Sequence, residues 1–289
     1  MYIDTHCHLN LKDFESDWRE VVEKAKKAGV SKMIVVGADL SSSKRAIEMA
    51  EEVEGLYAVV GFHPHHCKGL DDVDEMMASI EKLTKNKKVV AIGECGLDYH
   101  VYQKSKYEKT QVTEDQKKLQ KRVFGRQIQL ASKLNLPLVI HNREAQRDIL
   151  DTIDHFCKSD GKYPKGVFHC ISGSKKFVKQ LIERGFYVGV DGNVTYSSEV
   201  QALVDEIPLE RLLLETDSPW LTPEPLRSQQ KVPNRLSLKL QTADGLEPKL
   251  RNTPISVRIV AEYLSQAKNV SLEKIRASTT KNAEALFNI

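Results

Sequence analysis

The chain has 289 residues, of which 40% are hydrophobic and 29% charged, as in an ordinary folded protein with a sizeable core. The formal net charge of +3 allows an anionic substrate without demanding a nucleic-acid partner. Five irregularly spaced cysteines argue against a disulfide framework. The chain shows no signal peptide and no apolar run near the ~18 residues of a membrane span. We therefore expect a reducing, cytoplasmic location, with the nucleus as an alternative, and no membrane association.

Short apolar, β-branched runs alternate with stretches of helical pattern along the chain. The runs cover residues 2–6, 32–37, 56–63, 88–94, 136–141, 165–169, 185–192 and 211–216. Residues 17–29 and 121–135, between runs, carry apolar side chains on one helical face. Near-continuous apolar strands, each followed by a crossover, are typical of a parallel sheet covered by helices. Eight such units predict an α/β fold, a distorted (β/α)8 TIM barrel that residues 1–289 form as one domain. A doubly wound open sheet is the alternative.

Two polar segments interrupt this rhythm. Residues 100–120 follow the fourth run, and residues 224–252 follow the eighth. Barrel enzymes build their substrate-binding loops after the carboxyl ends of strands, so we interpret both segments as loop extensions that flank a site. Simple solvated loops are the alternative interpretation.

Metal-ligating residue types recur where the apolar runs end. They are His6, His8, His63, Glu94, His141, His169 and Asp217. A single histidine at a strand end is most often a hydrogen-bonded core residue. Residues from six different strands, however, share the carboxyl-terminal face of a barrel and are expected to form one site. Imidazole nitrogens and carboxylate oxygens are the donors that zinc, manganese and similar divalent ions accept.

The spacing of His6 and His8 suits a shared ion, because residues two apart on a strand point to the same side. Cys7 then points to the opposite side, and Cys95 and Cys170 are similarly out of phase with their neighbours. We interpret these cysteines as packing residues rather than thiolate ligands. The histidines and carboxylates are too many for one four-coordinate ion, and they suit two divalent ions bridged by a carboxylate.

Seven segments match a known family. They read IDTHCHLN (3–10), GFHPHH (61–66), AIGECGLDY (91–99), LPLVIHNREA (136–145), FHCISGS (168–174), LLLETDSPWLTP (212–223) and TTKNAEALF (279–287). In these segments the chain resembles the TatD family of metal-dependent deoxyribonucleases, within the amidohydrolase-like barrel superfamily. The resemblance runs from residue 2 to the carboxyl terminus, apart from the two polar segments.

The resemblance implies two divalent metal ions, Mg, Mn or Zn, and it assigns particular residues as ligands of each ion. His6, His8 and Asp217 would hold one ion, and His141 and His169 the other. Glu94 would bridge the two ions.

The resemblance also implies roles beyond metal binding. Asp217 would act as the general base on the attacking water. His63 would contact a phosphate, and Arg143 would clamp one, since a guanidinium fork suits that geometry. Glu215 would orient the site or contact substrate, with a simple ion pair as the alternative.

The function expected from this resemblance is 3′-5′ exonuclease-type hydrolysis of DNA by a two-metal-activated water. Single-stranded DNA or DNA 3′ ends would be the preferred substrate, and no obligate protein partner is expected. Bases of a single strand would stack on nearby aromatic side chains and so help to hold the substrate. The candidates are Tyr99, Tyr102, Tyr107 and Trp220. The alternative is that these side chains only pack against helices. One alternative is hydrolysis of another ester or amide, such as an aminoacyl-tRNA. Another is a non-catalytic metal-binding scaffold. Glu94 favours the nuclease, because relatives that act on carbonyl substrates often bridge their metals with a carboxylated lysine.

Overall fold

The computed structural model describes residues 1–70, 72–102, 112–157, 163–229 and 251–289. Its eight strands form one parallel sheet in which each strand pairs with the next strand along the chain. The strands are β1 (Tyr2–Cys7), β2 (Val30–Val36), β3 (Leu56–Val60), β4 (Val89–Asp98), β5 (Leu138–Arg143), β6 (Gly166–Phe168), β7 (Tyr187–Val190) and β8 (Leu212–Leu214).

The sheet curls into a nearly closed barrel, because the chain just after β8 returns to β1. His8 N donates to Ser218 O (2.8 Å), Asp217 N donates to His6 O (2.9 Å), and a parallel bridge joins Cys7 to Ser218. The distorted (β/α)8 barrel is confirmed, and the open-sheet alternative is wrong.

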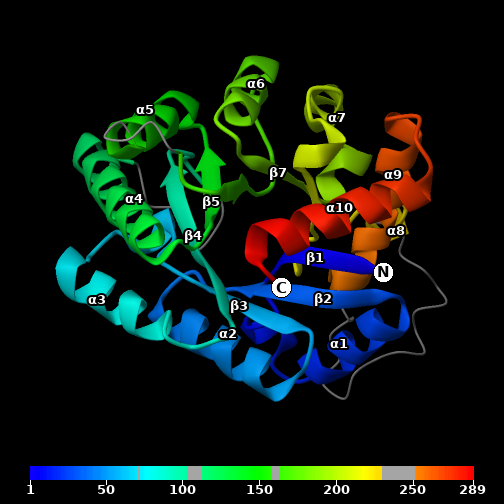
Figure 1. Ribbon diagram of the computed structural model, residues 1–289, viewed down its shortest axis with the longest axis horizontal. Helices are drawn as coiled ribbons and strands as arrows, with labels where there is room; N and C mark the ends of the chain where they lie inside the picture. The colour runs from blue at the N-terminus through cyan, green and yellow to red at the C-terminus, as the bar shows by residue number, and fades with distance from the viewer. Residues whose placement is uncertain (71, 103–111, 158–162, 230–250) are drawn as a thin grey trace.

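Helices surround the strands (Figure 1). They are α1 (Trp18–Lys27), α2 (Leu40–Glu52), α3 (Val73–Leu83), α4 (Glu114–Leu134), α5 (Gln146–Cys157), α6 (Lys175–Glu183), α7 (Ser198–Val204), α8 (Leu226–Gln229), α9 (Val257–Ala267) and α10 (Leu272–Phe287). Within the described ranges, none of them combines the length and the apolarity that crossing a membrane requires.

Two predicted boundaries are wrong in ways that matter for the site. α4 begins at Glu114, where Thr113 and Gln116 form a capping box, so the end of the predicted 100–120 extension is helix. β4 continues to Asp98, so Glu94 lies inside a strand rather than at its end. Residues 103–111 of the first predicted extension and residues 230–250 of the second lie outside the described residues.

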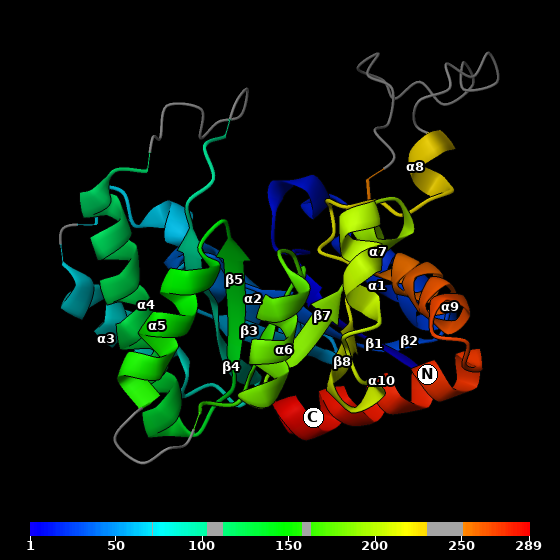
Figure 2. The same ribbon diagram turned by 90° about the horizontal axis from the view of Figure 1, so that it is seen from above.

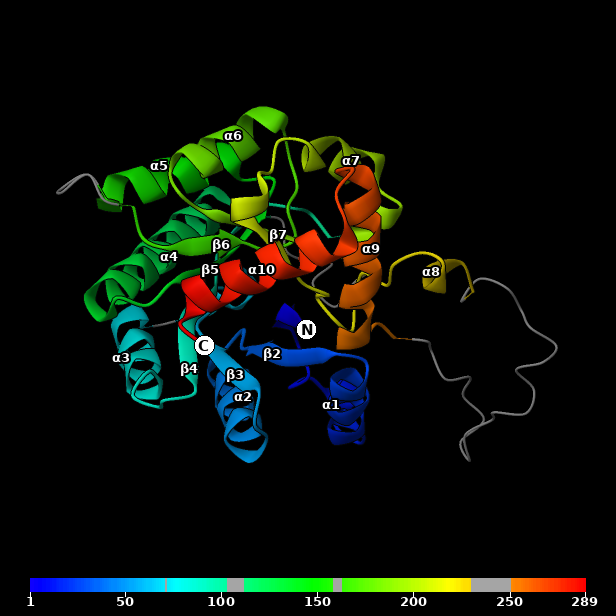
Figure 3. The ribbon, with the colours of Figure 1, turned by 45° about the vertical axis from the view of Figure 1, so that its right-hand side comes forward.

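One end of the barrel is sealed by α10. Its residues Ala283, Leu286 and Phe287 pack with Ile3, Val139 and other strand residues in a cluster separate from the main core. α10 also contacts β1 and β8. Figure 2 shows α10 at the end opposite to the one at which the β5 arrow points, and Figure 3 shows it crossing the strands beside α9. The carboxyl ends of the strands are therefore the end left for a site.

Candidate metal centre

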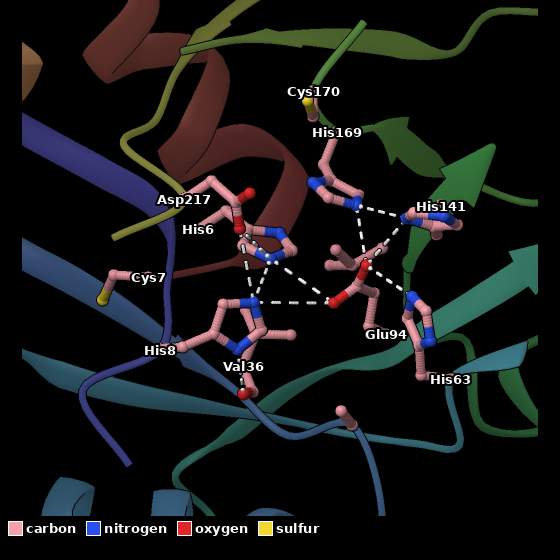
Figure 4. A network of polar contacts seen from close by, with 12 residues as sticks. His6, Cys7, His8, Val36, His63, Glu94, His141, His169, Cys170 and Asp217 are labelled. Carbon is pink, nitrogen blue, oxygen red and sulfur yellow. Dashed lines mark hydrogen bonds and ion pairs between the residues drawn. The ribbon is translucent and has the colours of Figure 1, made fainter. Parts of the chain in front are cut away.

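The six side chains predicted as metal ligands meet at the carboxyl-terminal end of the barrel (Figure 4). They come from β1 and the residue after it, from β4 and β5, and from the segments after β6 and β8: His6, His8, Glu94, His141, His169 and Asp217. Four of them are at least 94% buried, namely His6, His8, Glu94 and His169. Such burial of polar groups needs partners, and the six side chains face one another.

The first cluster consists of His6, His8 and Asp217. The two Nε2 atoms lie 3.0 Å apart, and Asp217 Oδ1 lies 3.6 Å from His6 Nε2 and 3.4 Å from His8 Nε2. One oxygen of Glu94, Oε2, lies 3.6 Å from both ring nitrogens. Asp217 turns into the cluster through a left-handed backbone conformation, with φ +50°. Two nitrogens and two carboxylates thus converge on one small volume.

The second cluster gathers around the other oxygen of Glu94. Oε1 lies 2.8 Å from His169 Nε2, 3.1 Å from His141 Nδ1 and 3.3 Å from His63 Nε2. The facing nitrogens of His141 and His169 are 3.2 Å apart. Glu94 therefore presents one carboxylate oxygen to each cluster, and Figure 4 shows it between them.

Local sequence explains part of this geometry. His6 and His8 point into the barrel mouth, whereas Cys7 points away and its thiol donates to Ile34 O, as the strand period predicts. Gly96 lets β4 approach β5 beside His141: its φ is +136°, and a Cβ there would lie 2.0 Å from His141 O. Any larger residue at this position would force the two strands apart.

The outer ring nitrogens of two histidines fix which nitrogen faces the centre. His8 Nδ1 donates to Val36 O (3.0 Å), and His141 Nε2 donates to Asp98 Oδ2 (3.1 Å). In the neutral rings, His8 Nε2 and His141 Nδ1 therefore carry lone pairs that point into the clusters. Lone pairs and carboxylates gathered together need a cation, so the residues fit a divalent metal centre.

His63 differs from the other histidines of the site. Its Nδ1 accepts a hydrogen bond from His65 N (3.1 Å), so the neutral ring carries its proton on Nε2, the atom that faces Glu94. His63 Nε2 can therefore donate a hydrogen bond into the site, which a metal ligand cannot do.

The electrostatics of the metal-free centre follow from burial and from the neighbouring charges. Burial lowers the pKa of His6 to about 4 and that of His63 to about 3, so both rings are neutral at pH 7. Burial also lowers the pKa of His141, but hydrogen bonds to Asp98 and Glu94 outweigh it and raise the pKa to about 9. Burial raises the pKa of Glu94, yet the imidazoles of His169 and His63 hold it well below its usual range. Metal binding would thus displace protons from this centre.

One buried acid behind the centre was missed from the sequence. Asp98 Oδ2 accepts hydrogen bonds from His65 Nε2 (2.7 Å), Tyr102 Oη (2.7 Å) and His141 Nε2. Asp98 Oδ1 accepts from His100 N (2.9 Å). Asp98 is four residues after Glu94 on the same strand, and the strand period would have placed both on one side had β4 been expected to continue.

The predicted substrate-side residues occupy different surroundings. Arg143, at the end of β5, is exposed, donates to Tyr102 Oη (2.9 Å) and stacks over the Tyr102 ring. The indole of Trp220 is 51% exposed and lies 5.1 Å from the His8 ring. Tyr99 donates to Asp148 and packs against the core, as the packing interpretation predicts. Tyr107 lies outside the described residues.

Glu215 is fully buried, which separates it from any molecule in the mouth of the barrel. One of its oxygens accepts a hydrogen bond from Cys170 N. His169 turns Nε2 toward Glu94 and Nδ1 toward Glu215, and a ligand-capable atom of His6 lies within 4.8 Å of the Glu215 carboxylate.

An eight-stranded barrel with such a cluster at its carboxyl end defines the class of barrel metallohydrolases. A family model described as TatD related DNase matches residues 3–288, and the chain belongs to this family. This membership confirms the predicted enzyme class, a TatD-like metal-dependent hydrolase acting on ester bonds.

Individual relatives span nearly the whole chain. A Bacillus subtilis protein described as an uncharacterized metal-dependent hydrolase, YabD, is 38% identical over 100% of both chains. A Cronobacter sakazakii protein described as 3′-5′ ssDNA/RNA exonuclease TatD is 31% identical over 98% of this chain and 97% of its own length. The crystal structure of the Escherichia coli TatD homologue YJJV superposes with a TM-score of 0.80 at 25% identity, covering 100% of this chain and 98% of that chain.

Proposed function

We propose that this protein is a deoxyribonuclease that hydrolyses DNA from the 3′ end with two divalent metal ions. In this proposal His6, His8 and Asp217 hold the first ion, and His141 and His169 hold the second. Glu94 bridges the ions. The observation that carries the proposal is the placement of the two Glu94 oxygens, each within 3.6 Å of a separate cluster of ring nitrogens.

Each residue has a task in phosphodiester hydrolysis. Two divalent ions, when held by these residues, would supply Lewis acidity at the phosphate and would lower the pKa of an attacking water. Asp217 Oδ1 faces the rings of His6 and His8, so Oδ2 can accept the proton of that water. His63 is neutral and carries its proton on Nε2, so it can donate a hydrogen bond to a phosphate oxygen that lies next to Glu94.

Two exposed groups flank the centre and suit a single strand. Arg143 follows His141 by two residues at the end of β5 and offers a guanidinium fork to a phosphate. Trp220 lies against His8, on the side of the first cluster, and offers an exposed indole on which a base can stack. The name of the Cronobacter relative supports 3′-5′ polarity on single strands. We further propose that residues 1–289 act as one catalytic domain, since the carboxyl-terminal α10 seals the barrel.

The test is a set of oligonucleotides labelled at the 5′ or the 3′ end, single- or double-stranded, incubated with Mg²⁺, Mn²⁺ or Zn²⁺. We expect stepwise shortening of 5′-labelled single strands and early release of label from 3′-labelled ones. Asp217→Ala and Glu94→Ala should abolish cleavage, whereas Trp220→Phe should retain it. Full activity in both acid variants would exclude the mechanism. If the protein cleaves none of the DNA substrates but hydrolyses an aminoacyl-tRNA, the proposed substrate class is wrong and the alternative ester substrate is correct.

A further inference from the structure

Four histidines surround the candidate metal centre with one nitrogen facing inward and one facing outward. A histidine that binds a metal through one nitrogen must carry a proton on the other, and that N–H needs an acceptor. His8 and His141 have such acceptors, Val36 O and Asp98 Oδ2. The outward nitrogens of His6 and His169 are both buried and have no hydrogen-bond partner among the described residues.

A third unsatisfied atom lies in the same place. Glu215 Oε2 is buried and, within the described part of the chain, has no partner either. His169 Nδ1 lies 4.0 Å from Glu215 Oε1, and one ligand-capable atom each of His6, His169 and Glu215 lies within 4.8 Å of the others. The rings of His6 and His169 are stacked, with centroids 4.0 Å apart and planes inclined by 15°. Both rings therefore lie next to the Glu215 carboxylate.

We infer that Glu215 is a positioning residue shared by the two metal sites. In the metal-loaded protein its carboxylate accepts the Nδ1–H of both His6 and His169. These two hydrogen bonds orient the rings so that the Nε2 lone pair of His6 points toward the first ion and that of His169 toward the second. This inference rests on the proposed two-metal function, and of the two roles predicted for Glu215 from the sequence it develops the orienting role rather than the substrate contact. A single carboxylate then orients one ligand of each ion.

The surroundings of Glu215 keep its carboxylate in this position. Oε1 is held by the backbone N–H of Cys170, which immediately follows His169. Gly189 of β7 leaves the space on the other side: a Cβ there would lie 2.2 Å from Glu215 Oε2 and 2.6 Å from its carboxyl carbon. An alanine at position 189 would therefore displace the carboxylate without changing its charge.

The nearby acid Asp191 offers a matched control. Like Glu215 it is fully buried, with one oxygen accepting from a backbone N–H, that of Asn193 (2.7 Å), and the other unsatisfied among the described residues. Unlike Glu215 it is in no group of ligand-capable atoms with His6 and His169 in the described ranges. Asp191→Asn thus repeats the chemical change of Glu215→Gln at a neighbouring acid that is outside that group.

The experiment measures binding of Co²⁺ to the full-length metal-free protein, by visible absorption with a competing chelator. In Glu215→Gln, the amide can still accept from Cys170 N, but it presents an N–H to the ring N–H groups. We expect Co²⁺ affinity to fall about 10- to 100-fold with an altered absorption band and unchanged stoichiometry. Gly189→Ala should weaken binding in the same direction, and Asp191→Asn should bind as the wild type does. Circular dichroism of the metal-free variants checks that all of them fold.

Three results would overturn the inference. The first is wild-type affinity and spectrum in a folded Glu215→Gln variant. The second is an equal loss in Asp191→Asn, which would indicate a general effect of buried charge. The third is the loss of one bound ion per chain in Glu215→Gln, which would make Glu215 a direct ligand of an additional ion. Failure of the wild-type protein to bind Co²⁺ would instead refute the metal centre of the proposed function.

Discussion

The substitution Asp98→Asn tests whether the acid behind His141 is essential to the stability of the site. Three donors converge on Oδ2, from His65, Tyr102 and His141, whereas Oδ1 accepts from His100 N alone among the described residues. An asparagine that keeps the Oδ1 bond places its NH₂ group against all three donors. A flipped asparagine loses the backbone bond instead. No orientation of the amide therefore replaces the carboxylate.

The magnitude follows from the number of bonds and from burial. Hydrogen bonds to a charged group contribute about 1.5–3 kcal/mol each, so three of them set an upper limit of about 9 kcal/mol. Removing the charge of this 99% buried carboxylate also removes its desolvation cost, which offsets part of that loss. Breaking a buried ion pair typically costs about 3–5 kcal/mol, and we expect a destabilisation in this range for the metal-free protein.

Urea unfolding at pH 7, followed by circular dichroism, measures the loss. Tyr102→Phe is the control, because it removes one of the three donors and leaves the carboxylate with both histidines. Its expected cost is about 1.5–3 kcal/mol, the contribution of one hydrogen bond to a charged group. The reasoning is refuted if Asp98→Asn destabilises the protein no more than Tyr102→Phe does.

Three further predictions concern substrate and metal. Arg143→Lys keeps the positive charge but loses the guanidinium fork, so KM for DNA should rise about tenfold, equivalent to about 1.4 kcal/mol, with little change in kcat. An unchanged KM would show that Arg143 does not bind a phosphate. Trp220→Ala in an Asp217→Asn background should weaken single-strand binding by about 1–3 kcal/mol in fluorescence anisotropy, and equal affinities would exclude stacking. Chelation with EDTA should abolish activity, and divalent metal at about 100 times its Kd should restore it and stabilise the fold by about 2.7 kcal/mol; activity that survives chelation would contradict the metal requirement.

The sequence was sufficient to predict the barrel and to bring the candidate ligands together. Each ligand lies at or near the end of a short apolar run, and parallel strands place their carboxyl ends at one face. The period of two also predicted correctly that His6 and His8 point together and that Cys7 points away. These features depend on local pattern and on topology, which a single sequence carries well.

The acids Asp98 and Glu215 were harder to predict. Their placement depends on the residue at which each strand ends, because side chains alternate between the two faces only within a strand. Asp98 was overlooked because the apolar pattern of β4 fades after Glu94, although the strand continues to Asp98 itself. Glu215 and Asp217 are two apart, and strand periodicity would place them on one side. β8 ends at Leu214, however, and the positive φ of Asp217 turns the chain, so Asp217 faces His8 while Glu215 lies behind the rings of His6 and His169. The local sequence thus predicts which residues are candidate ligands, whereas the orientation of their side chains depends on backbone turns that only the folded chain defines.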